Sequence, residues 1–230
     1  MNQSSITAVV KDLFEKHFFS IADWLSRDLK LPPAFVRYPS YPGMSVIVKG
    51  QRVLEFKFSS QPLLGEEGNY AFVETTNDAA CFVPYGSKGP MITIDADELA
   101  SEAEAADVPK EALLEILVLH EMVHACMMGR IAQLHKNHSW MVAPEFRYIH
   151  EAVALKASEF GLSGFLEVAT AEHVAKYLSH IKTASNDRDS GAFYKPYFDT
   201  YRTVAHGDFW AQLRASQPAP GIFEMVESSQ

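Results

Sequence analysis

Residues 113–126 constrain this chain most, because they form an almost wholly apolar run that contains a His-Glu-x-x-His pattern at His120, Glu121 and His124. On a helix, side chains four residues apart lie on one face, so His120 and His124 can present two imidazoles to one metal ion. Glu121 is rotated about 100° from His120. Its carboxylate would therefore lie beside the metal, where a general base holds the attacking water.

The apolar surroundings strengthen this interpretation. A lone histidine on an apolar helix is more often a hydrogen-bonded core residue than a metal ligand. Here two imidazoles and a carboxylate share one helix with little other polar surface. Burying them without partners would cost several kcal/mol, and a bound metal ion removes that cost. The pattern therefore predicts a metal site on a buried helix.

Composition narrows the class of protein. The formal net charge of −9 argues against binding to nucleic acid or to anionic membranes. The sequence has no charged-then-apolar leader and no apolar run of about 18 residues. Its two cysteines, Cys81 and Cys126, form no C-x-x-C pair, which is typical of a reduced compartment. We expect a cytoplasmic protein that does not bind membranes, although export by a non-classical route would leave the same pattern.

The order of expected elements indicates an α+β fold. Helical spacing predicts a first helix over residues 6–29. Short β-branched or aromatic runs predict strands at residues 35–38, 44–48, 52–58, 70–75 and 91–95, with a hairpin turn at Lys49-Gly50. We expect a small mixed or antiparallel sheet of four or five strands. Residues 76–84 receive no assignment.

The second half is expected to be helical. Asp107 and Pro109 are start signals for the central helix, which Gly129 ends or kinks. A short acidic helix that starts near residue 97 precedes the central helix. Further helices are predicted after the central helix, over residues 144–160, 165–181, 192–205 and 209–215.

This order resembles that of the zincin metallopeptidases, on the strength of residues 92–95 followed by residues 118–125. The resemblance implies one zincin-like domain over residues 1–230: helix plus sheet in 1–108, active-site helix and helical half in 109–215, and a tail in 216–230. It also implies that His120 and His124 bind Zn²⁺ and that Glu121 activates water. Substrate would add as a strand to residues 91–95 or to the loop before them.

The third zinc ligand distinguishes the zincin subfamilies. Metzincins require Gly at position 127 and His at position 130, where this chain has Met127 and Arg130. Gluzincins take a Glu from the next helix, and Glu151 follows His124 at a plausible turn-around distance, in a segment that resembles their Glu-x-x-Ala. The strongest apolar face of that helix points away from Glu151. An exposed Glu in a surface ion pair is the alternative interpretation.

Two histidines compete with Glu151. His138 follows His124 at close to the spacing found in SprT-like proteases, which are the second resemblance. His206 precedes a Gly and nearby aromatics, as the third histidine of that family does, but it lies much farther along the chain from His124. His206 could instead stabilise the oxyanion, as could Tyr148 or Tyr201. His150 is expected to be buried and hydrogen-bonded rather than a ligand.

The sequence thus predicts a zinc-dependent metallopeptidase that acts on a peptide or protein substrate, with Glu121 as general base. One rival is a catalytically inactive zincin-fold binding or scaffold protein, which keeps the helix and a structural metal. Another is a SprT-like protease that acts on DNA-associated proteins, which the acidic charge balance disfavours.

Overall fold

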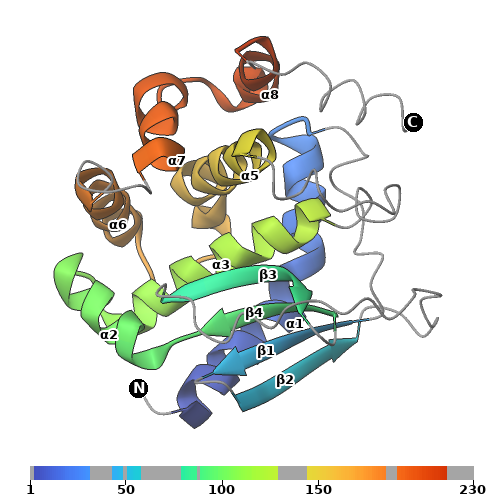
Figure 1. Ribbon diagram of the computed structural model, residues 1–230, viewed down its shortest axis with the longest axis vertical. Coiled ribbons are helices and arrows are strands. Elements are labelled where there is room, and N and C mark those ends of the chain that lie inside the picture. The colour runs from blue at the N-terminus through green and yellow to red at the C-terminus, as the bar shows by residue number, and fades with distance from the viewer. Residues whose placement is uncertain are drawn as a thin grey trace.

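The computed structural model describes residues 3–31, 43–48, 51–57, 79–86, 89–128, 144–184 and 191–216. Within these ranges the chain forms one small sheet and a larger set of helices, so the predicted α+β class is confirmed (Figure 1). None of the described helices is both long and apolar enough to span a bilayer.

The sheet is mixed and has the strand order β2-β1-β4-β3. Its strands are β1 (Gly43–Val48), β2 (Gln51–Lys57), β3 (Ala80–Gly86) and β4 (Gly89–Ile94). β1 pairs with β2 in antiparallel fashion and with β4 in parallel fashion, and β3 pairs with β4 in antiparallel fashion. Three of these strands lie where strands were predicted, whereas β3 begins in the unassigned stretch and extends two residues past it. The predicted strands at residues 35–38 and 70–75, and the turn at residues 49–50, lie outside the described residues.

Residues 91–95, one of the two places expected for substrate to add as a strand, do not lie at an edge of the sheet. β4 is hydrogen-bonded on one side to β1 and on the other to β3, so its backbone has no open edge for an added strand. The outer strand beside the central helix is β3. Residues 87–88 of the loop between β3 and β4 lie outside the described residues.

The helices follow the predicted order. They are α1 (Gln3–Arg27), α2 (Ala96–Ala105), α3 (Lys110–Met128), α5 (Pro144–Lys156), α6 (Ala171–Ala184), α7 (Gly191–Pro196) and α8 (His206–Ala215). A π-helical turn, η2 (Ala157–Gly161), and a 3₁₀ turn, η3 (Leu162–Gly164), follow α5, and a second π-helical turn, η4 (Tyr197–Tyr201), follows α7. Asp95 starts α2 by accepting hydrogen bonds from the amides of Asp97 and Glu98.

A buried carboxylate explains why the helix predicted from residue 165 begins only at Ala171. Glu115 of α3 accepts hydrogen bonds from three successive amides, those of Glu167, Val168 and Ala169, at 2.7, 3.0 and 2.6 Å. These amides point at one acceptor, so they do not enter a helix. These three hydrogen bonds attach the segment before α6 to α3.

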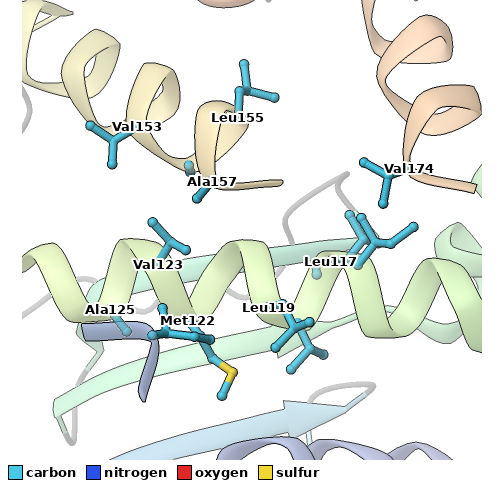
Figure 2. Close-up of a cluster of buried hydrophobic side chains, with 14 of the residues drawn as sticks. Leu117, Leu119, Met122, Val123, Ala125, Val153, Leu155, Ala157 and Val174 are labelled. Carbon is cyan, nitrogen blue, oxygen red and sulfur yellow. The ribbon is translucent and has the colours of Figure 1, made fainter. Parts of the chain in front are cut away.

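The central helix α3 lies between the sheet and α5 (Figure 1). Every residue from 112 to 127 is buried, as expected for a helix that is apolar on all sides. Val123 faces Val153 of α5 and Ala157 of η2, while Leu119 and Met122 point to the opposite side of α3 (Figure 2). α3 is therefore covered on both sides, and its few polar side chains lie inside the protein.

Candidate metal centre

α3 brings the two histidines and the glutamate of the pattern together inside the protein. His120, Glu121 and His124 are each only 7% exposed. One nitrogen of each ring and one oxygen of the carboxylate all lie within 4.8 Å of one another. The two Nε2 atoms, one helical turn apart, are separated by 3.2 Å. This buried group could hold a metal ion.

α5 adds a second carboxylate. The Glu151 oxygens lie 3.8 Å from His120 Nε2 and 3.6 Å from His124 Nε2. Donors at about 2.1 Å from a tetrahedral ion are about 3.4 Å apart, which is close to these separations. Glu151 Oε2 is buried and accepts no hydrogen bond from the described residues. The residues present therefore fit a cation bound by His120, His124 and Glu151.

Glu151 reaches this position because α5 is buried on more than one face. Residues 152–158 are all buried, and α5 packs against α3 on one side and against α7 and η4 on others. The apolar face that carries Ile149 and Val153 is thus not the only covered one. The exposed ion pair that was the alternative for Glu151 is not found among the described residues, where its carboxylate lies against the rings of His120 and His124.

The other ring nitrogen of each candidate ligand also has a partner. Ser158 Oγ donates to the Ala154 carbonyl oxygen at 2.9 Å, so it can accept the Nδ1–H of His120 at 3.1 Å. His124 Nδ1 lies 3.4 Å from Nδ1 of His150, with the two rings parallel to within 2°. Partners of this kind fix the tautomer and leave Nε2 available to a metal. His150 is buried, as predicted, whereas the role of Ser158 was missed; its only signal is that it lies two helical turns after Glu151.

Burial and charge together set the protonation states of the centre. Burial acts to raise the pKa of Glu151, but His124, His120 and His150 outweigh it and hold that pKa at about 2. Burial lowers the pKa of His124 to about 4. At neutral pH the carboxylate is charged and this imidazole is neutral, which are the forms that bind a metal ion. Burial also acts to lower the pKa of His120, yet Glu151 and Glu121 outweigh it and raise that pKa. A cation bound at Nε2 of His120 would compete with a proton for that nitrogen.

Glu121 has a main-chain partner that the sequence did not reveal. Its Oε2 accepts a hydrogen bond of 2.7 Å from the backbone N–H of Phe82 in β3. β3 lies beside α3, so the strand that received no assignment is the one that contacts the candidate base.

The structure does not bring His206 to this group. It starts α8, and its ring contacts Phe160 and Trp24, with centroids 4.4 and 6.4 Å away. His138, the other histidine considered as third ligand, lies outside the described residues.

Neither tyrosine considered for the oxyanion has a contact with the candidate ligands among the described interactions. Tyr201 is buried, and its hydroxyl is hydrogen-bonded to Ser216 Oγ at 2.9 Å. Tyr148 is half-buried, and its ring lies 5.9 Å from that of Tyr201. Tyr201 also contacts the ring of Phe209, and its carbonyl oxygen accepts a hydrogen bond from Lys156 Nζ.

Comparisons with protein-family models, curated proteins and solved structures give no match. What this chain does is therefore inferred from the residues of the candidate metal centre.

Proposed function

We propose that this protein is a zinc-dependent metallopeptidase with a zincin-like fold, in which His120, His124 and Glu151 bind the metal. The supporting observation is the position of Glu151, whose carboxylate lies 3.6 to 3.8 Å from both Nε2 atoms with one buried oxygen that accepts no hydrogen bond from the described residues. Two imidazoles and one carboxylate are a donor set of catalytic zinc sites, which keep a fourth position open. When bound, Zn²⁺ lowers the pKa of water to about 7 and polarises a carbonyl group.

The residues around the metal position would have distinct roles in the reaction. Ser158 and His150 orient the two imidazoles, and Glu151 supplies negative charge. Glu121 accepts a proton from the attacking water and delivers it to the leaving amine, a role that contributes typically about 10²–10⁴-fold. The outer edge of β3 is a place for an extended peptide to add as a strand.

The test combines metal analysis with a cleavage assay on fluorescein-labelled casein. The wild-type protein should bind one Zn²⁺, and a chelator should stop cleavage. Glu121→Gln should abolish turnover and still bind zinc, because Glu121 is the base and not a ligand. His120→Ala should lose the metal. Full activity in Glu121→Gln, or one bound zinc in His120→Ala, would refute the assignment.

A second candidate is a binding or scaffold protein with a structural metal. One observation favours it: a Glu121 oxygen lies within 4.8 Å of both imidazoles, so Glu121 could complete a closed set of four ligands with His120, His124 and Glu151. In that case Glu121→Gln would weaken zinc binding strongly, and the zinc-loaded wild type would not cleave casein. In a peptidase, the same variant keeps its zinc affinity.

A further inference from the structure

The backbone N–H of Phe82 points away from the sheet. β3 and β4 are antiparallel, so alternate residues of β3 direct their backbone groups toward β4. The Ala79 carbonyl oxygen accepts the amide of Asp95 at 3.0 Å, which places residues 79 and 81 in the set that faces β4. Phe82 belongs to the other set, and its N–H instead donates to Glu121 Oε2 at 2.7 Å.

We propose that this amide is a positioning group for Glu121, an inference that rests on the proposed peptidase function. Glu121 is buried, and one of its oxygens lies within 4.8 Å of both candidate imidazoles. The Phe82 amide holds Oε2 and thereby fixes the orientation of the carboxylate beside the two imidazoles. The edge strand next to the helix thus sets the geometry of the base.

This placement has a consequence for substrate binding. A peptide that adds to the open edge of β3 would normally accept hydrogen bonds from the amides that point outward. The amide of Phe82 is already used by Glu121. Peptide binding therefore relies on the other outward groups of β3, and removing the Phe82 amide should alter kcat rather than KM.

Phe82→Pro removes this N–H and no bond of the β3–β4 ladder. Proline is tolerated on edge strands where the missing N–H faces away from the neighbouring strand, and Pro84 already lies in β3. The matched control is Phe82→Ala, which loses the ring and keeps the amide. The kcat of Phe82→Pro for fluorescein-labelled casein should be about 10- to 100-fold below that of Phe82→Ala, the effect of losing one hydrogen bond to a charged group or of a misplaced base. The KM values and the zinc affinities of the two variants should agree.

A second measurement does not depend on cleavage. Acetohydroxamate chelates zinc and shares its hydroxyl proton with a neighbouring carboxylate, so its affinity for the zinc-loaded protein reports the position of Glu121. Phe82→Pro should bind it about tenfold more weakly than Phe82→Ala when Glu121 is present. The two variants should bind it equally in the Glu121→Ala background.

A third measurement needs no proline variant. Amide hydrogen exchange at Phe82 should be slow in the zinc-loaded wild type and fast in Glu121→Ala, while the ladder amide of Cys81 stays protected in both. This result stands even if Phe82→Pro does not fold.

Equal kcat in Phe82→Pro and Phe82→Ala, a change confined to KM, or unchanged exchange at Phe82 in Glu121→Ala would overturn the proposal. So would a loss of acetohydroxamate affinity that is the same with and without Glu121. If the wild type cleaves no casein while the hydroxamate and exchange results hold, the peptidase function fails and the positioning of Glu121 stands.

Discussion

Ser158→Ala removes the partner of one candidate ligand without touching the ligand itself. Ser158 Oγ lies 3.1 Å from His120 Nδ1, and the residue is only 2% exposed. In the variant no water can easily take the place of the hydroxyl. A metal on Nε2 keeps the proton on Nδ1, so the N–H of His120 would be buried without its acceptor whenever the metal is bound.

The expected loss follows from that unpaired N–H. Leaving a buried donor unsatisfied costs about 1–3 kcal/mol, and losing the hydrogen-bond partner of a metal-bound histidine lowers metal affinity about 10- to 100-fold. At a free zinc concentration of about 1,000 times the wild-type Kd, binding stabilises the folded wild type by about 4 kcal/mol. At the same concentration Ser158→Ala should keep only about 1.4–2.7 kcal/mol of this stabilisation.

Thermal unfolding with and without zinc measures this difference. For a chain of this size, each kcal/mol corresponds to about 2–4 °C in Tm, so zinc should raise the wild-type Tm by about 8–16 °C and that of Ser158→Ala by about 3–11 °C. Ser163→Ala is the control, because Ser163 is exposed and contacts only the Phe160 carbonyl oxygen among its described partners. A zinc-induced shift in Ser158→Ala as large as in the wild type would refute the orienting role of the hydroxyl.

Two further predictions concern stability and thiol chemistry. Glu115→Gln should lower the free energy of unfolding by about 2–3 kcal/mol in urea titrations, because its amide group cannot accept all three hydrogen bonds that the carboxylate accepts. Glu104 is exposed, so the control variant Glu104→Gln should change the free energy of unfolding by less than about 0.5 kcal/mol. Similar losses in the two variants would contradict the role given to Glu115. Burial raises the pKa of the Cys126 thiol, so at pH 8 it is protonated and shielded, whereas Cys81 is half-buried. The native protein should therefore react with one equivalent of a disulfide reagent, at Cys81; two fast-reacting thiols would show that Cys126 is accessible.

The residues of the centre that were predictable are those whose relation is local. His120 and His124 are one turn apart, so a helix is enough to bring them together. Glu151 was the leading third candidate on spacing, but a helix-face argument counted against it. That argument assumed one covered face, and α5 has several, because α3, α7 and η4 all pack on it.

The features that sequence reasoning missed depend on distant partners. β3 contains alanine, glycine and Pro84, so its own pattern is weak, and it becomes a strand by pairing with β4. In the sequence, Glu115 is a single acidic residue within an apolar run, with no sign of a partner. Its three amide donors belong to a connection much later in the chain, and no local pattern reveals them.

The spacing of the candidate ligands along the sequence also has a consequence for the order in which the protein folds. His120 and His124 come from one helix, whereas Glu151 comes from α5, which begins at Pro144, well after α3 ends at Met128. A nascent chain can present the two imidazoles as soon as α3 forms, since helices form from local contacts. The carboxylate joins them only after α5 has docked. Tight zinc binding would then indicate a late step of folding. It would distinguish chains in which α5 has docked on α3 from chains that have only collapsed.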